Sequence, residues 1–330
     1  MIFYWRHRNQ FTHSLNALYR SVGTSKQGFH RMLYRSSRFK EEVANLIKII
    51  IQIRQDHPTM CCRDMYYKIN PVYIGRDKFE SICKEFGFQM NPKRNFKRTT
   101  DSNGVERFPN LTQNITLSKV NQVWSSDITY FDLGGVFYYL TFILDNYSRK
   151  ILGYNVSARL QTEQTSLPAL KSAIKQRGEI PEGIIFHSDG GGQYYDQNFL
   201  KLTNRYKFKN SMCEYAYENG KAERLNGVIK NNYLKHWDIK NLSDLTRSVD
   251  RAVRLYNTEK PHIGLKRLTP KQFEHEYLIF EKRNKSTTNE SIDEKIRFSG
   301  RRALENLSET RSRTQISSLK KLDLMVEYND

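Results

Sequence analysis

The sequence predicts an α/β catalytic core on a mixed sheet, preceded by all-α units at the amino-terminal end. After residue 123, three β-rich runs lie close together and are followed by alternating helical and extended segments, a pattern typical of a mixed sheet. Before residue 90, apolar residues recur at helical spacing. With 330 residues, the chain is long enough for two or three domains.

The chain is strongly basic, with a formal net charge of +19. Residues 1–120 carry +12 of this charge, residues 121–280 carry +5 and residues 281–330 carry +2. Such a surplus is typical of proteins that bind a polyanion, most often nucleic acid. Its concentration at the front favours a DNA-binding module ahead of a more neutral catalytic part. The alternative is a basic surface that only keeps the protein soluble.

Residues 12–36 contain two short helical patterns around a break at Gly23, with Thr24 or Ser25 as the cap of the second helix. This second helix directs three apolar side chains inward: Phe29, Met32 and Leu33. It leaves four polar side chains on the outer face: Lys26, Gln27, His30 and Arg31. The spacing predicts a helix-turn-helix unit whose outer face contacts DNA, although many such helix pairs only pack.

Residues 41–88 predict a second helical unit, with a helix over 41–55, a short helix near 63–69 and a third from about residue 74. Arg76 and Lys78 lie in the first turn of the third helix, where a recognition helix meets DNA. The alternative is an ordinary solvated helix start. A basic linker without apolar periodicity follows over 91–104 and could follow phosphates through four residues: Lys93, Arg94, Lys97 and Arg98.

The catalytic part begins with strands predicted over 123–133, 136–146 and 150–158, joined by turns at 134–135 and 146–148. A helix over 162–176, a strand over 183–188, a helix over 196–204, a strand over 208–212 and a long helix over 218–236 follow. After residue 280 the apolar content thins, and the sequence predicts a tail of little regular structure.

Two aspartates occupy unusual positions in these strands. Asp127 lies within an apolar and β-branched run, where burial of an acid is costly unless a charged partner meets it. Asp189 follows the strand over 183–188 and precedes three glycines in "HSDGGGQY". If the two strands are neighbours, both acids approach the same edge of the sheet.

Glu223 supplies a third acid in "YENGKAERLNGVIKNNYLKHW". Drawn as a helix, this segment has an apolar stripe of Ala222, Leu225, Ile229 and Tyr233. Directly beside it runs a narrow polar stripe of Asn219, Glu223, Asn226 and Lys230. A polar band along the flank of a buried face is typical of a cleft wall, and Lys230 could hold a phosphate there.

Three acids on two strands and a helix are suited to a two-metal phosphoryl-transfer site. Oxygen ligands favour Mg²⁺ or Mn²⁺, which also relieve the repulsion between the carboxylates. Two such ions about 4 Å apart can activate the attacking oxygen and stabilise the leaving one. The alternative interpretation is three unrelated surface acids.

The joint occurrence of Asp127, "HSDGGGQY" with Asp189, and "NGKAERLNGVIK" with Glu223 resembles the DDE catalytic core of retroviral-type integrases and bacterial insertion-sequence transposases. The segment "YNTEKPHIGLKRLTPKQF" over 256–273 resembles an ending common in those transposases, so the resemblance covers roughly residues 12–275. It implies a ribonuclease H-like fold and a metal-binding catalytic role for Asp127, Asp189 and Glu223. It further implies that Lys230 contacts DNA ends, and we expect Asn226 on the same stripe to do so as well.

The sequence departs from this family in places. The 33 residues between Asp189 and Glu223 are fewer than in many relatives, and Glu214 and Glu218 are rival acids in that stretch. The four cysteines form no CxxC pair, so the zinc-binding unit that precedes the core of retroviral integrases is not expected. The helical front end favours a bacterial mobile element.

The sequence therefore predicts a transposase that binds the terminal repeats of its element, cleaves the DNA with metal-activated water and joins the 3′-hydroxyl ends to target DNA. Two Mg²⁺ or Mn²⁺ ions are the expected cofactors. A homodimer or larger synaptic assembly is expected, with a small upstream helix-turn-helix protein or fusion as a further partner. Two alternatives stay open: a catalytically silent DNA-binding repressor of the element, and a ribonuclease H-fold nuclease or resolvase.

The predicted domains are a helix-turn-helix unit over 1–40, a second helical DNA-binding unit over 41–90, a basic linker over 91–118, the catalytic core over 119–280 and a tail over 281–330. No run of 18 apolar residues and no signal peptide occur in the sequence. We expect a cytoplasmic, nucleoid-associated protein without a membrane partner.

Overall fold

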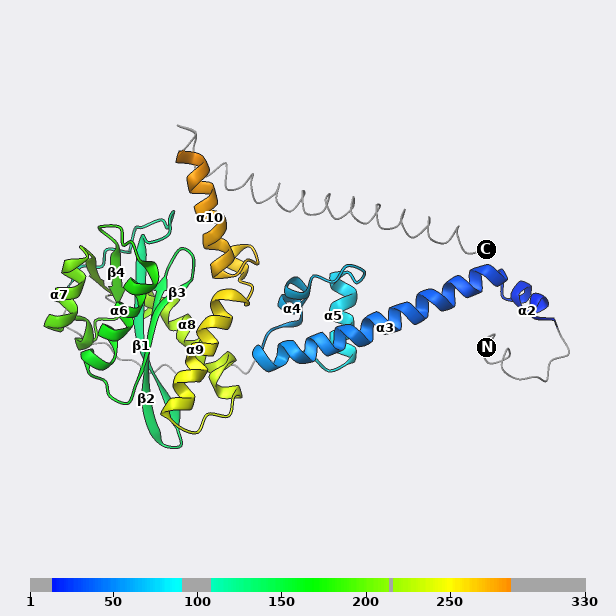
Figure 1. Ribbon diagram of the computed structural model, residues 1–330, viewed down its shortest axis with the longest axis horizontal. Helices are drawn as coiled ribbons and strands as arrows, with labels where there is room; N and C mark the ends of the chain where they lie inside the picture. The colour runs from blue at the N-terminus through cyan, green and yellow to red at the C-terminus, as the bar shows by residue number, and fades with distance from the viewer. Residues whose placement is uncertain (1–13, 91–107, 214–215, 286–330) are drawn as a thin grey trace. The chain divides into compact units, whose positions relative to one another are not determined.

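The computed structural model describes residues 14–90, 108–213 and 216–285 (Figure 1). By their contacts, residues 1–275 form one unit, and the described part of the second unit is the end of helix α10. The predicted basic residues Lys93, Arg94, Lys97 and Arg98 lie outside the described residues, as does the rival acid Glu214. The described helices include none with the length and apolar character needed to cross a bilayer.

Helix α2 spans Leu15–Ser21 and helix α3 spans Lys26–Asp56. Gly23 adopts a φ of 68° in the turn between them, and the Ser25 hydroxyl accepts a hydrogen bond from the backbone N–H of Gly28, so Ser25 is the cap. Tyr19 packs against Phe29 with ring centroids 5.5 Å apart. The inward placement predicted for Met32 is wrong, because seven-residue α2 covers little of α3 and Met32 stays 57% exposed.

Helix α3 runs without interruption through residues 40 and 41, where the sequence predicts the boundary between two helical units. Its second half packs on helices α4 (Cys62–Ile69) and α5 (Arg76–Glu85). The cluster between these helices buries Leu46 and Ile50 of α3 against Met65 and Phe79. This packing holds α4 and α5 against the last turns of α3.

Five strands form one sheet: β1 (Val123–Leu133), β2 (Val136–Asp145), β3 (Ile151–Ser157), β4 (Ile185–Ser188) and β5 (Lys209–Met212). Their order is β3-β2-β1-β4-β5. β2 is antiparallel to both β1 and β3, whereas β4 is parallel to β1 and β5. The predicted mixed sheet is confirmed, with the strand arrangement of a ribonuclease H-like core.

Helices cover both faces of this sheet (Figure 1). On one face, α6 (Ser166–Arg177) and α7 (Gln197–Arg205) enclose a cluster that includes Trp124 and Phe186. On the other, α8 (Gly220–Asn232) and α9 (Leu242–Thr258) pack on Phe142 and Leu144. Because helices cover both faces of the sheet, its strands contain continuous runs of apolar residues, which is the signal that predicts them from the sequence.

The predicted helix over 218–236 is divided in the structure. Short 3₁₀ turns over Ala216–Asn219 and Leu234–His236 flank α8, which ends at Asn232. Helix α9 and helix α10 (Pro270–Lys285) were not predicted. The buried side chains of α9 recur at helical spacing (Leu245, Val249, Ala252 and Tyr256), so its pattern was present in the sequence.

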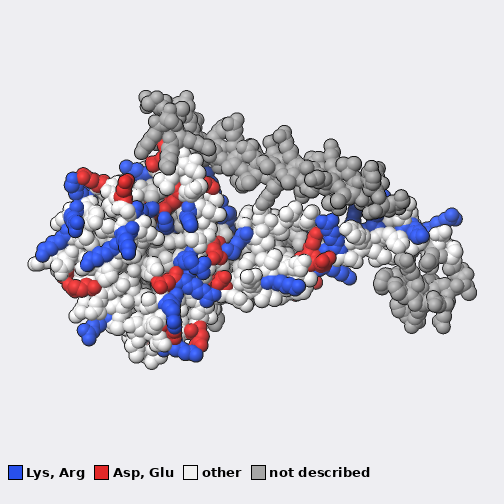
Figure 2. All heavy atoms as spheres, in the orientation of Figure 1, with Lys and Arg blue, Asp and Glu red and all other residues white. Residues whose placement is uncertain are grey.

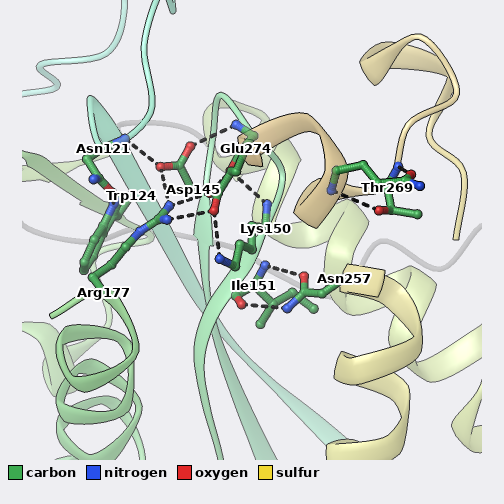
Figure 3. Close-up of polar contacts among 11 residues, drawn as sticks. Asn121, Trp124, Asp145, Lys150, Ile151, Arg177, Asn257, Thr269 and Glu274 are labelled. Carbon is green, nitrogen blue, oxygen red and sulfur yellow. Dashed lines mark hydrogen bonds and ion pairs between the residues drawn. The ribbon is translucent and has the colours of Figure 1, made fainter. Parts of the chain in front are cut away.

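A buried ionic cluster joins the start of α10 to the sheet (Figure 3). Arg177 at the end of α6 donates to Glu274 at 2.9 and 2.6 Å and to Asp145 at 3.2 Å, while Lys150 donates to Glu274 at 2.8 Å. The other oxygen of Asp145 accepts from the backbone N–H groups of residues 147 and 148, as expected for a residue that shapes the turn after β2. Two cations therefore meet two anions.

The segment over 256–273 also contacts β3 directly. The side-chain amide of Asn257 accepts from the N–H of Ile151 and donates to its C=O, both at 2.9 Å (Figure 3). The Thr269 hydroxyl accepts from the N–H of Gln272 at 3.2 Å, and the Gln272 side chain accepts from the N–H of Thr269. This reciprocal pair is a capping box at the start of α10.

Candidate active site

The strand register brings the two predicted aspartates to one edge of the sheet. β1 and β4 are parallel and pair only over Val123–Ser125 and Ile185–His187, with Ser125 opposite His187. Asp127 and Asp189 each lie two residues beyond that last pair, so the parallel chains carry both acids the same distance past it. Beyond Ser125, β1 is no longer paired with β4, so both carboxyls lie just past the end of this pairing.

The glycines after Asp189 allow the chain to turn in very little space. Gly190 has a φ of 75°, and a Cβ there would lie 2.4 Å from the Met212 side chain. The N–H of Gly191 donates to Asp189 Oδ1 at 3.2 Å, which fixes the carboxyl against its own turn. Just after this turn in the chain, the hydroxyl of the buried Tyr194 lies 2.9 Å from Ser126 Oγ. The turn is thereby tied to β1 next to Asp127.

Helix α8 lies along β1 through the polar stripe that the sequence predicts. Asn219 Nδ2 donates to the C=O of Ser126 at 2.9 Å, and Asn226 Nδ2 donates to Asp127 Oδ2 at 2.7 Å. One turn further on, Lys230 Nζ donates to Thr129 Oγ1 at 2.6 Å. Glu223 is exposed to solvent and lies on the same stripe, three residues before Asn226. Because Asn226 bonds Asp127, Glu223 belongs to the helix face that borders Asp127.

The three carboxyls influence one another electrostatically. Burial, followed by the charges of Asp189 and Glu223, raises the pKa of Asp127 to about 7, although the Asn226 hydrogen bond opposes the rise. Burial of its carboxyl also raises the pKa of Asp189, although the residue as a whole is exposed, and the Gly191 N–H opposes this shift. The pKa of Glu223 is raised by partial burial and by Asp189. The acids thus form one region of negative charge.

The donor set of this region suits a hard divalent cation. All three groups are carboxylates, whose oxygens are the ligands preferred by Mg²⁺ and Mn²⁺, and their mutual repulsion is the kind that a cation relieves. In the described part of the chain, no three acidic, histidine or cysteine side chains converge closely enough to ligate a single ion together. The residues fit the ion in chemistry, and coordination requires the carboxyls to draw closer.

The residues predicted to contact DNA are divided among separate elements. Asn226 is 4% exposed and bonded to Asp127, and Lys230 is half-buried and bonded to β1. On α3, three side chains are exposed and His30 is half-buried; the exposed ones are Lys26, Gln27 and Arg31. On α5, both predicted residues are exposed: Arg76, which pairs with Asp77, and Lys78, which lies over the Phe39 ring. Of the predicted DNA contacts that the structure describes, only Asn226 and Lys230 lie beside the carboxyls.

Several contacts around the site were missed by the sequence interpretation, which had considered His187 only as a residue that orients its neighbours or a phosphate. Ser126 bonds both Tyr194 and Asn219, and Thr129 bonds Lys230. Thr129 could have been found, because strand alternation puts it on the same face as Asp127. His187 is buried and its Nδ1 lies 3.0 Å from Ser211 Oγ, while burial lowers its pKa to about 4. The Ser126–Tyr194 contact has no local signal, since 68 residues separate the partners.

Comparison with known proteins agrees with this geometry. Residues 118–217 and residues 204–270 each match a model described as integrase core domain. The chain is 27% identical over 264 residues to the insertion element IS600 uncharacterized 31 kDa protein of Shigella sonnei, covering 77% of this chain and 96% of that protein. Residues 118–270 are thus similar to integrase core domains, and the chain is similar to insertion-sequence transposases.

The matched residues of the integrase core include Asp127, Asp189 and Glu223. A second relative is the transposase for insertion sequence element IS904 of Lactococcus lactis, 28% identical over 50% of this chain and 66% of that protein. Among solved structures, the HTLV-2 integrase catalytic core domain in complex with magnesium has a TM-score of 0.38 at 20% identity, covering 47% of this chain and 97% of that one. The family match and the relatives support a transposase or integrase function.

Proposed function

We propose that the chain is a DDE transposase that cleaves DNA at the ends of its element and joins the 3′-hydroxyl ends to target DNA. The observation that carries the proposal is the parallel register of β1 and β4. This register puts Asp127 and Asp189 side by side, with Glu223 on the helix that packs along β1. On this proposal, the chain segments at β1, at the end of β4 and in α8 contribute one acid each to a single site.

In the proposed reaction, Asp127, Asp189 and Glu223 hold two divalent cations, Mg²⁺ or Mn²⁺. When bound, the ions lower the pKa of the attacking oxygen and stabilise charge on the leaving one. In the first step, a water oxygen forms a bond to phosphorus and the bond to the 3′-oxygen of the element breaks. In the second, that 3′-hydroxyl attacks a target phosphodiester and a target 3′-oxygen leaves. No protein nucleophile is required.

The chain's own residues would orient the site. Asn226 holds Oδ2 of Asp127 and would orient this carboxyl toward a ligand. The backbone of Gly191 does the same for Asp189. Lys230 brings a positive charge to the open edge of β1, two residues from Asp127 at Thr129, where a DNA phosphate would be neutralised. Figure 2 shows further Lys and Arg side chains spread over the visible surface, which suits a polyanionic substrate.

The helical region and the assembly belong to the same proposal. Exposed Lys26, Gln27 and Arg31 on α3 and Arg76 and Lys78 on α5 would contact the terminal repeats of the element. A dimer or larger assembly would hold both ends together. The alternative of a silent DNA-binding repressor would not require the acids to share one edge of the sheet, so the observed register favours the enzyme.

The test uses the full chain with labelled DNA carrying the element ends and Mg²⁺ or Mn²⁺. Wild type should nick and join the DNA, whereas Asp189→Asn should lose joining by about 100-fold or more, because loss of a ligand should exceed the roughly 10- to 100-fold loss typical for residues that only support a ligand. Asp238→Asn, at an exposed acid that pairs with Lys240, is the matched control and should act as wild type. Asp189→Cys should recover activity in Mn²⁺ but not in Mg²⁺, because thiolates prefer softer ions. Full joining by Asp189→Asn would refute the assignment.

A further inference from the structure

The β1–β2 hairpin exposes two aromatic side chains that the core does not use. Tyr130 is 50% exposed and Phe137 is 51% exposed, and their ring centroids lie 5.4 Å apart in an edge-to-face arrangement. Phe137 pairs with Asp132 across the hairpin, and Asp132 shares a face with Tyr130 by strand alternation. The pair therefore forms a small aromatic surface on one face of the hairpin, open to a ligand.

A positive charge lies beside this aromatic surface. Lys230 Nζ is 5.3 Å from the centroid of the Tyr130 ring and donates to the C=O of Tyr130 at 3.3 Å. Helix α8 packs on the face of β1 that carries Asp127, and the Tyr130 side chain points to the other face. Lys230 can contact Thr129 on one face and the Tyr130 ring on the other because β1 pairs with β4 only as far as Ser125, which leaves the edge of β1 accessible.

The aromatic surface is close to the carboxyls along the same strand. Tyr130 follows Asp127 by three residues, which corresponds to about 10 Å in an extended chain. A DNA strand whose phosphate lies beside Asp127 could therefore reach the hairpin with one of its next nucleotides. To reach Tyr130, the DNA strand must cross from the face of β1 that carries Asp127 to the opposite face. It can do so at the unpaired edge of β1 beyond Ser125, where Lys230 lies.

The chemistry of the surface favours a nucleobase as its occupant. Exposed aromatic rings beside a cation are how proteins hold single-stranded nucleic acid, because each base has a π-face and each nucleotide a negative charge. Bases inside a paired duplex are already stacked and would not be available. A second copy packed hairpin to hairpin would bring two Lys230 charges together, which is unfavourable.

We propose that Tyr130 and Phe137 stack an unpaired base at the DNA end, with Lys230 against the adjoining phosphate. This inference rests on the proposed function and specifies one feature of its substrate, namely an end whose last base pairs are open. Stacking would stabilise the opened end and hold the scissile strand away from its complement. Unpaired bases next to the cleavage position should then improve binding.

The test measures binding of the full chain in EDTA, so that no cleavage occurs. The probes are a blunt duplex and the same duplex with unpaired bases at one end, one of them 2-aminopurine, whose fluorescence falls on stacking. Stacking on proteins is tolerant of sequence, so an arbitrary sequence suffices. Tyr130→Ala and Phe137→Ala should weaken binding of the unpaired end by about 5- to 100-fold and restore the fluorescence. Both variants should bind the blunt duplex with the same affinity as wild type.

Val136→Ala is the matched control, because Val136 is 53% exposed on the same hairpin but pairs with Leu133, whose side chain packs toward the opposite face. It should bind both probes as wild type does, and Tyr130→Phe should retain stacking. Equal affinity of wild type and Tyr130→Ala for the unpaired end would overturn the inference. So would a change of oligomeric state in Tyr130→Ala with unchanged DNA binding, which would identify a contact between copies. In either case a loss of joining in Asp189→Asn would leave the proposed function standing.

Discussion

Asn226 donates a hydrogen bond of 2.7 Å to Asp127, and its side chain is 4% exposed. The sequence predicts Asn226 as a DNA contact, but in the structure its amide faces the carboxyl rather than solvent. Its Oδ1 has no partner within the described part of the chain. The two residues come from a strand and a helix 99 positions apart, so their contact depends on how α8 packs on the sheet.

The first prediction separates these two roles of Asn226. Asn226→Ala should lower DNA nicking about tenfold, because the Asp127 carboxyl loses the donor that orients it. Affinity for end DNA, measured by fluorescence anisotropy, should stay within about twofold. Asn231→Ala, at an exposed position of the same helix, is the control and should change neither quantity. A large loss of affinity with Asn226→Ala would support direct contact with DNA instead.

The ionic cluster around Glu274 gives a prediction for stability. Burial raises the pKa of Glu274, but hydrogen bonds and charge from Arg177 and Lys150 outweigh this, and its pKa lies below the ordinary value. Glu274→Gln leaves the half-buried Arg177 with Asp145 alone and removes the anion that pairs with Lys150, so the free energy of unfolding in urea should fall by about 3 kcal/mol. Glu182→Gln, which breaks the exposed pair with Lys207, should cost less than about 1 kcal/mol. Equal costs would mean that the cluster contributes no more than a surface pair.

Gly153 on β3 gives a prediction about packing. A Cβ at this position would lie 2.2 Å from the C=O of Ala169 and 2.6 Å from the N–H of Ala173, both backbone atoms of α6 that cannot move alone. Gly153→Ala should therefore push α6 off the sheet and lower the free energy of unfolding by about 3 kcal/mol. Gly75→Ala, with no atom near the added methyl group, should change it by less than about 1 kcal/mol. A neutral Gly153→Ala would show that α6 can shift without cost.

His57 gives a prediction for the dependence of stability on pH. Burial, followed by the charge of Lys68, lowers its pKa from 6.5 to about 4, and its ring lies 3.1 Å from the Tyr233 hydroxyl. Between these pH values the unfolded chain binds the proton and the folded one does not, so stability falls as the pH drops from 6.5 to 4. The share of His57 in that loss is about 3 kcal/mol.

The measurement is a series of urea unfolding curves between pH 8 and pH 4. His57→Gln should show a shallower acid loss than wild type, although not a flat one, because His187 and His262 also have pKa values lowered by burial, to about 4 and about 3. His275→Gln, at an exposed histidine, is the control and should follow wild type. Parallel curves for wild type and His57→Gln would contradict the assignment.

The sequence alone determined the elements whose signals are local. The bounds of β1 match the predicted run over 123–133, because apolar and β-branched residues fill it and Gly134-Gly135 ends it. The cap at Ser25 and the turn at Gly23 are equally local. The polar stripe of α8 was also visible, since helical spacing fixes which residues share a face. Met32 was misplaced because periodicity shows which side chains align and not whether another element covers them.

Only the tertiary structure decided which of these residues meet. The pairing of Ser125 with His187 sets the two aspartates at one level, and no local pattern contains that register. The same holds for Asn226 on Asp127 and for Lys230 beside Tyr130, contacts between residues about 100 positions apart. Spacing along a chain fixes direction within one element, whereas the distance between elements depends on burial of their apolar faces against each other.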